Sequence, residues 1–89
     1  MKPYKLVAID WVDSSSTGMA WRQISDFGEE TRSPLQCRTV GYIIAETKIA
    51  VTLVMNLAYG KGKPPHSAGN DMNIPKCSIL KIRKITQKL

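Results

Sequence analysis

The chain has 89 residues, enough for one domain and too few for two, and its 13 Lys and Arg outnumber its 7 Asp and Glu to give a formal net charge of +6. Two cysteines and one histidine exclude a cysteine-rich disulfide framework and a zinc site of about four closely spaced ligands. No apolar run approaches the ~20 residues of a membrane span, and no segment resembles a signal peptide. We therefore expect a cytoplasmic protein with reduced thiols and with no metal, cofactor or membrane contact.

The positive charge is concentrated in the second half of the chain. Residues 1–46 hold five basic and six acidic residues, whereas residues 47–89 hold eight basic residues and one acidic residue, so the two parts carry −1 and +7. An excess of this kind attracts nucleic acid, nucleotides or an acidic protein surface. The same pattern is also typical of a solvated basic surface that binds nothing.

The first predicted strand covers residues 4–12, and apolar residues occupy both of its faces. Val7, Ile9 and Trp11 alternate along one face, a pattern typical of a strand enclosed in a small barrel or an interface. We therefore expect Trp11 to lie in the core or in the wall of a pocket.

A stretch of small hydroxyl residues, "SSSTG", separates this strand from a segment in which Trp21, Ile24 and Phe27 recur every three residues. This spacing predicts one or two helical turns. Asp and Ser after a strand form side-chain-to-backbone turns, so we expect Asp13 and Ser14 to fix this loop. Trp21 is then expected to be the apolar anchor of the loop.

Residues 36–46 and 48–58 form the clearest pair of predicted strands, and the short turn between them predicts a hairpin. Gly41 within the first of these strands indicates a bend or the close approach of another backbone. In the second strand, alternation places five apolar residues on one face, namely Ile49, Val51, Leu53, Met55 and Leu57.

The remaining residues are harder to assign. Residues 59–73, "YGKGKPPHSAGNDMN", contain three glycines and two prolines and predict a long, flexible, exposed loop. In residues 74–89, the spacing of Ile79, Ile82 and Ile85 fits one face of a helix. The β-branched residues and the preceding proline favour a strand that closes a barrel. Both readings of this last segment stay open.

No enzyme class has a positive signal in the sequence. Asp10 and Asp13 could pair for acid–base chemistry or bind a hard cation, but residues three apart on a strand face opposite sides. The serine run lacks a G-x-S-x-G elbow, and His66 lies in the predicted loop without an orienting partner. Cys37 and Cys77 lie in predicted strands, so we expect at least one buried thiol. We therefore expect no catalytic residues and a non-enzymatic protein.

Several short motifs follow one another along the chain: a first strand ending in W-x-D-S, a tryptophan after a glycine, a strand pair, and I-P-x-x-x-I-x-x-I/L. The residues that carry them are Trp11, Asp13 and Ser14; Gly18 and Trp21; Gly41-Tyr42 and Thr52-Leu53; and Ile74, Pro75, Ile79 and Ile82. In this layout the chain resembles a group of small bacteriophage proteins over about residues 6–85. Its gap between Gly18 and Trp21 is longer than in their pattern. The resemblance implies a phage origin and no established activity.

The expected strand order and the final Ile-Pro strand are also similar to Sm-like barrels, in which a bent sheet closes on itself and subunits pair edge to edge. We therefore predict a mainly β fold over residues 1–89: one small domain, a bent-sheet barrel of about five strands with one short helical segment. Strands with two apolar faces in so short a chain further predict a homo-oligomer.

Three hypotheses for function follow. The first is a phage protein that counters host defence in the host cytoplasm, by capturing an anionic nucleotide-like ligand or by blocking a defence protein. The second is an Sm-like nucleic-acid-binding protein, and the third is a small structural or assembly protein of a virion. For the first hypothesis, the loop at 59–73 would act as a lid. The candidate ligand-binding residues are Lys61, Lys63, Lys81, Arg83 and Lys84, together with Asp13, Ser14 and Trp21.

Overall fold

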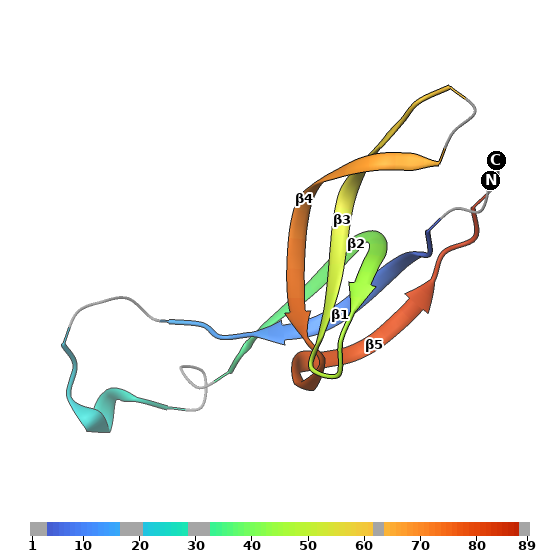
Figure 1. The fold of residues 1–89 in the computed structure, drawn as a ribbon. Helices are drawn as coiled ribbons and strands as arrows, with labels where there is room; N and C mark the ends of the chain where they lie inside the picture. The colour runs from blue at the N-terminus through green and yellow to red at the C-terminus, as the bar shows by residue number, and fades with distance from the viewer. Residues whose placement is uncertain (1–3, 17–20, 29–32, 62–63, 88–89) are drawn as a thin grey trace.

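The computed structural model describes residues 4–16, 21–28, 33–61 and 64–87. Within them the fold is mainly β, as predicted, with two 3-10 turns, η1 (Ile24–Asp26) and η3 (Lys76–Ser78). One five-stranded antiparallel sheet accounts for the strands, which are β1 (Leu6–Asp13), β2 (Leu35–Glu46), β3 (Ala50–Tyr59), β4 (Pro65–Pro75) and β5 (Ile79–Lys84) (Figure 1).

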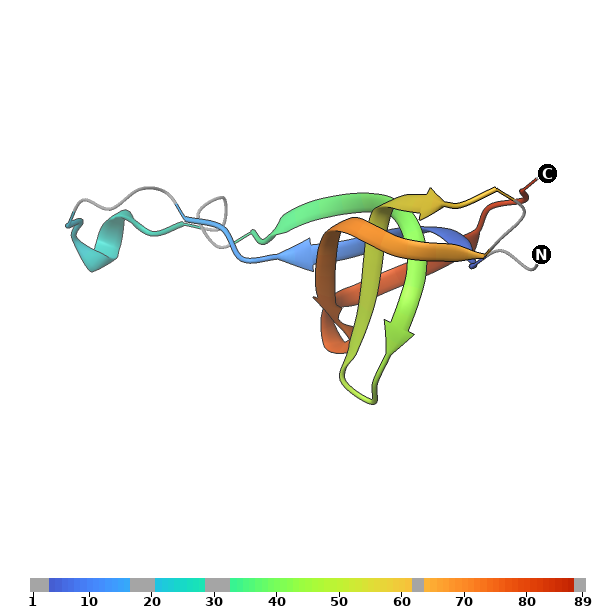
Figure 2. The ribbon, with the colours of Figure 1, turned by 45° about the horizontal axis from the view of Figure 1, so that its top comes forward.

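The strand order in the sheet is β4-β3-β2-β1-β5. The first strand therefore lies between β2 and the last strand, and both of its neighbours run antiparallel to it. The sheet is strongly bent, so that β3 and β4 cross over β1 (Figures 1 and 2). Among the described residues β4 and β5 do not pair with each other, and the sheet is open along these two edges.

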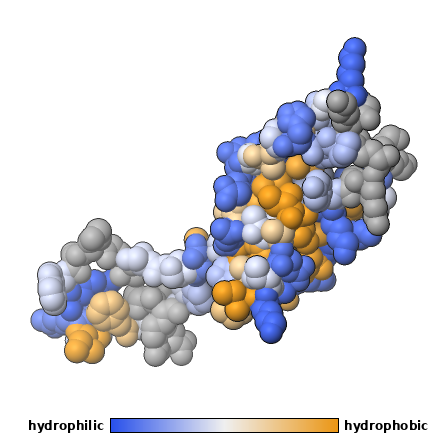
Figure 3. All heavy atoms as spheres, viewed as in Figure 1, coloured by the Kyte–Doolittle hydropathy of each residue, from blue (hydrophilic) through white to orange (hydrophobic). Residues whose placement is uncertain are grey.

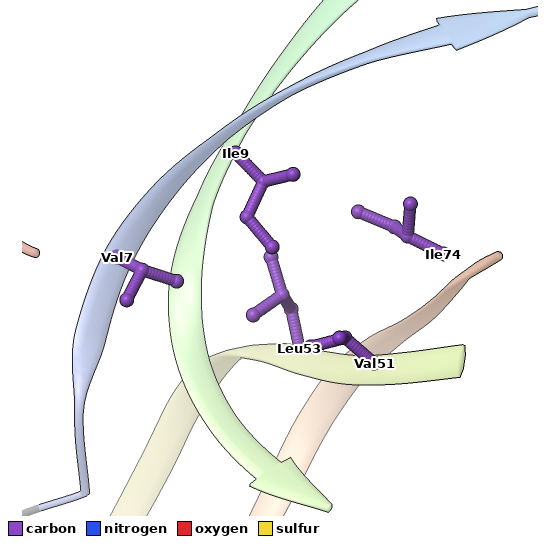
Figure 4. Close-up of a cluster of buried hydrophobic side chains, with 5 residues drawn as sticks. All are labelled: Val7, Ile9, Val51, Leu53 and Ile74. Carbon is purple, nitrogen blue, oxygen red and sulfur yellow. The ribbon is translucent and has the colours of Figure 1, made fainter. Parts of the chain in front are cut away.

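The core lies on the concave, inner face of the bent sheet. Its five central side chains are Val7, Ile9, Val51, Leu53 and Ile74, which converge from β1, β3 and β4 (Figure 4). Each is at most 2% exposed. The predicted alternation along β1 and β3 therefore identifies the main core residues. Trp11 packs against this cluster and donates a hydrogen bond from Nε1 to Thr39 Oγ1 at 3.0 Å, which confirms its expected place beside the core.

Gly41 is buried in β2 at the point where β3 approaches most closely. A Cβ atom at this position would lie 2.8 Å from the carbonyl oxygen of Val54 in β3. Real Cβ atoms do not come this close to a backbone oxygen, so the site accepts only glycine without a shift of the neighbouring strand. The predicted close approach of another backbone is confirmed.

The prediction of a long loop at 59–73 is wrong, because most of this segment forms β4. Pro65 and Pro75 stand at the two ends of the strand, and β4 pairs on one side only, with β3. An edge strand of this kind tolerates proline and polar residues that a central strand would not. Asn70 adopts a positive φ of 58° beside Gly69, within the strand. No lid of the predicted extent exists.

The last segment is a strand, and it is shorter than the predicted one. The I-P pair at Ile74 and Pro75 belongs to the end of β4, and the 3-10 turn η3 then redirects the chain into β5. Cys77 lies in η3 and is exposed, whereas Cys37 in β2 is half-buried, and both thiols are free. The expectation that one thiol is buried is wrong, because η3 leaves the sheet and turns towards solvent.

The described residues between these strands, 14–16, 21–28 and 33–34, which we call the arm, lie beyond the point where the ladder of β1 and β2 ends, at the pair Asp13 and Leu35. The arm points away from the strands (Figures 1 and 2). It makes the molecule 61 Å long and 24 Å across, and the radius of gyration of 17.7 Å exceeds the ~12 Å of a compact chain of this length. Trp21 is 101% exposed, so the prediction that it anchors a loop is wrong.

Candidate anion-binding surface

The outer face of the sheet carries a cluster of charged side chains around Asp10 of β1. Because directly paired residues in an antiparallel sheet share a face, Arg38 of β2 and Lys81 of β5 flank Asp10 on this face. Arg83, paired with the neighbouring Ala8, joins them. We call these four residues the Asp10 cluster. With three cations and one carboxylate, the Asp10 cluster has a formal charge of +2.

The geometry of the cluster is tightest between Asp10 and Arg38. Arg38 donates from Nε to Oδ1 at 2.6 Å and from Nη2 to Oδ2 at 3.2 Å, a two-pronged ion pair. Arg83 Nη2 lies 3.6 Å from Oδ2, which is beyond hydrogen-bonding distance. Arg38 therefore holds the carboxylate, while Arg83 contributes mainly its charge.

These contacts keep Asp10 ionised. The hydrogen bond from Arg38 has the largest effect and lowers the pKa of Asp10; desolvation raises it by less, and the charges of Arg38, Arg83 and Lys81, each of smaller effect, lower it again. The same hydrogen bond raises the pKa of Arg38. Both groups are partly open to water, so the pair orients the side chains more than it stabilises the fold.

A shallow hollow of about 310 Å³ lies beside the cluster on the outer face. This volume is at the lower limit of small-ligand sites, which span about 300–1,000 Å³. Its lining combines cations, a carboxylate, an amide and apolar groups, contributed by Asp10, Gln36, Cys37, Arg38, Leu80 and Lys81. A phosphate group at its rim would meet ammonium and guanidinium donors, and the apolar part would suit the flat face of a base.

The predicted ligand-binding residues do not come together at one place. Lys81 and Arg83 lie in the Asp10 cluster, whereas Lys84 is paired with Val7 and starts from the inner face of β5. Lys61 lies in the turn after β3, at the opposite end of the molecule from the arm (Figure 1). Lys63 lies outside the described residues.

The three candidates from the first loop lie at or beyond the base of the arm. Asp13 Oδ1 accepts a hydrogen bond from the backbone N–H of Ser14 at 2.8 Å, at the point where β1 ends. Trp21 lies three residues before η1, in a segment that is far from β5 (Figure 1). These residues therefore do not share a site with the Asp10 cluster.

Sequence reasoning missed the partnership of Asp10 and Arg38. The run "VAIDWV" places a lone charge, Asp10, inside an apolar strand. Such a charge needs a counter-charge on an adjacent strand. Arg38 in "CRTV" is the matching charge within a predicted strand, so this signal could have identified the pair.

Comparison of the chain with protein-family models, with curated proteins and with solved structures found no match. Among the described residues, no group of three or more His, Cys, Asp or Glu side chains is arranged to hold a metal ion. Within the same residues, no helix has the length and apolar character needed to cross a lipid bilayer. The argument for function therefore rests on the charged surface itself.

Proposed function

We propose that the chain is a non-enzymatic binding protein that captures an anionic, nucleotide-like ligand on the outer face of its sheet. One observation carries the proposal: Lys81, Arg83 and Arg38 converge on Asp10 at the rim of a hollow and leave an excess of positive charge there. Arg38 is held in place by its ion pair, so its remaining donors are presented in a fixed direction.

Arg83 and Lys81 are the residues most suited to contact a phosphate. The side chain of Arg83 is 46% exposed and makes only the 3.6 Å contact with Asp10. No ion pair of Lys81 occurs among the described residues. A phosphate could therefore engage both side chains without first displacing a hydrogen bond between charged groups.

The resemblance to small bacteriophage proteins supplies the biological setting of the proposal. Phage proteins without enzymatic motifs act on the host by binding, so a captured ligand would be a signalling nucleotide of the host's defence. Blocking a defence protein is the other form of the same role. In this setting the protein acts in the host cytoplasm as a homo-oligomer.

A second candidate function is binding of single-stranded nucleic acid by an Sm-like barrel. The strand order, the strong bend of the sheet and the 3-10 turn before β5 support this architecture. The exposed cations of the edge strand β5, with Lys81 and Arg83 on one face and Lys84 on the other, offer a phosphate backbone several contacts along this edge. Several phosphates would then contribute, and affinity would fall steeply with salt.

The experiment compares the variant Lys81→Gln/Arg83→Gln with the control Lys48→Gln/Lys84→Gln. Both remove two positive charges, but only the first removes them from the Asp10 cluster. Thermal shift and calorimetry would be run with a cyclic dinucleotide and with a short single-stranded oligonucleotide. Hydrogen bonds to charged groups contribute about 1.5–3 kcal/mol each. We therefore expect the first variant to bind the dinucleotide at least about 100-fold more weakly, and the control to bind within a few-fold of wild type.

The readouts separate the two candidates. Binding of the oligonucleotide with a strong salt dependence, and equal losses in both variants, would favour the nucleic-acid function. Full binding by Lys81→Gln/Arg83→Gln, or no binding of either probe by the wild type, would show that the basic face is only a solvated surface.

A further inference from the structure

The tip of the arm presents apolar side chains that no part of the sheet covers. Trp21 is 101% exposed, Ile24 is 91% exposed and Phe27 is 46% exposed. They lie on one short segment, residues 21–28, in which Ile24 begins η1, Trp21 precedes it and Phe27 follows it. Figure 3 shows hydrophobic side chains at the end of the arm, separated from those over the sheet. We call these three residues the tip cluster.

The arm holds the tip cluster away from its own sheet. Ser15 Oγ donates a hydrogen bond to the backbone carbonyl of Ser33 at 2.9 Å, so the two limbs of the arm stay together beyond the end of the ladder. The arm thereby continues the direction of the β1–β2 ribbon and points outward (Figures 1 and 2). At the tip, the guanidinium of Arg22 lies 5.2 Å from the ring centroid of Phe27 and orders that ring.

The sheet has an apolar notch whose lining suits apolar side chains such as those of the tip cluster. The N-terminal half of β2 pairs only with β1. The C-terminal half of β3 extends beyond its last pair with β2 and remains paired with β4. The β1–β2 ribbon and the β3–β4 ribbon therefore diverge. Between them lies a hollow of about 450 Å³. Its apolar lining comes from Val40, Leu53, Met55 and Met72. Val40, Met55 and Met72 are each at least 40% exposed.

We propose that the tip cluster of one chain docks into this notch of a second copy, and that the two copies exchange arms reciprocally. The volume of the notch suits one indole ring with part of a second side chain, and methionine adapts its shape to an inserted aromatic. The inference is independent of the proposed ligand, because the Asp10 cluster makes up no part of the tip cluster and supplies only Arg38 to the rim of the notch.

The area buried at one notch is small. A buried aromatic side chain covers about 150–250 Å², so Trp21 with part of a second side chain covers about 250–300 Å² on the arm. If the notch lost a similar area, one contact would bury about 500–600 Å² and two reciprocal contacts about 1,000–1,200 Å², at the lower limit of specific interfaces, which bury about 1,200–2,000 Å². Two contacts are therefore needed, which favours reciprocal exchange with two-fold symmetry.

Charge also favours a second copy as the occupant. Residues 14–34 hold two basic and three acidic residues, a net charge of −1, whereas residues 35–89 hold nine basic and two acidic residues, a net charge of +7. The segment is therefore opposite in net charge to the rest of the sequence, which favours its association with the sheet of another copy. An arm that met another arm would bring like charges together.

Two variants test the two sides of the contact. Trp21→Ser/Ile24→Ser removes the tip cluster, and Met55→Lys places a charge in the notch at a position that is 60% exposed. The matched control is Ile49→Ser, because Ile49 is 77% exposed in the β2–β3 turn, outside both surfaces. Melting temperatures would establish that every variant is folded.

Sedimentation of the wild type should show a dimer at micromolar concentration. Each test variant should raise the dissociation constant at least about 30-fold, the scale for truncating an aromatic hot spot, and the control should leave it unchanged. In an equal mixture of the two test variants, the intact arm of Met55→Lys can enter the intact notch of Trp21→Ser/Ile24→Ser, so a mixed pair has one intact contact. Because reciprocal exchange needs two intact contacts, the mixture should associate more weakly than the wild type. Recovery to the wild-type dissociation constant would indicate a one-way contact and would contradict reciprocal exchange.

Fluorescence of Trp11→Phe, in which Trp21 is the single tryptophan, distinguishes the other occupants. In the dimer its emission should be blue-shifted and protected from a water-soluble quencher, and dilution should reverse both effects. A monomer with protected Trp21 would mean that the arm folds back on its own sheet. A monomer with accessible Trp21 would mean that a different protein, or nothing, covers the tip. A dimer that survives both test variants would mean association through the sheet edges. Each of these three results overturns the proposal.

Discussion

Replacing Gly41 by alanine tests the packing of the sheet at its closest point. The added Cβ would lie 2.8 Å from the Val54 carbonyl oxygen and 3.4 Å from Leu53 Cβ. The carbonyl belongs to backbone that is paired with β2 and β4, so β3 can move away only by straining two ladders. Overpacking of this kind costs about 1–3 kcal/mol.

The net effect is smaller, because alanine also restricts the unfolded chain. That restriction stabilises the folded state by about 0.4–1 kcal/mol. We therefore expect Gly41→Ala to lower the free energy of unfolding by about 1–2 kcal/mol. The total free energy of unfolding of a domain of this length is about 4–13 kcal/mol. The melting temperature should fall by about 4–16 °C.

Urea unfolding followed by circular dichroism measures this change, and Gly69→Ala provides the control. A Cβ at Gly69 meets nothing within 4 Å, so the same chemical change should leave stability unchanged or raise it slightly. The slope of the unfolding curve should be the same in all three proteins. Equal stability of Gly41→Ala and wild type, or equal loss in both variants, would refute the reasoning.

Two further predictions concern titration and thiol reactivity. Folding lowers the pKa of Asp10 below its ordinary value of 3.8, chiefly through the Arg38 hydrogen bond, so its contribution to stability is complete above that value and is lost as the pH falls through the lowered pKa. Asp10→Asn should therefore flatten the acid limb of a plot of melting temperature against pH, and an unchanged limb would contradict the role of the pair. Cys77 is exposed and Cys37 is half-buried, so a thiol reagent should label Cys77 in the native protein at nearly the unfolded rate and Cys37 more slowly. Mass spectrometry after short labelling reads both sites, and faster labelling of Cys37 would contradict the described burial.

The alternation of apolar residues predicted three strands and most of the core. Val7 and Ile9 in β1, and Val51 and Leu53 in β3, stand at the predicted positions and are almost completely buried. This success has a simple cause, because a two-residue period on a half-buried strand is a direct imprint of the core.

The predicted loop shows where this reasoning ends. β4 contributes only one fully buried side chain, Ile74, and its stability comes from backbone pairing with β3. A polar edge strand shows no two-residue repeat of apolar residues. Its glycine and prolines therefore indicated a loop more strongly than any pattern indicated a strand. The composition of this segment alone does not reveal that β3 pairs with it and orders it.

Only part of the candidate site was predicted, because its arrangement also depends on the pairing of strands. The cations of β5 were evident from charge, but the register that puts Lys81 and Arg83 on one face and Lys84 on the other depends on pairing with β1. A shift of one residue would exchange the two faces. The exposure of Trp21 was also unpredictable, because helical spacing of apolar residues is the same whether the face is covered or free.

The pairing of β1 with β5 has a consequence for the order in which the molecule forms. One edge of β1, an apolar strand near the start of the chain, is completed only by residues 79–84. While the protein is being synthesised, that edge has open amide and carbonyl groups until residues 79–84 have left the ribosome. The nascent chain is thus exposed to mispairing with other nascent chains through Val7 and Ile9, and slow translation would prolong that interval.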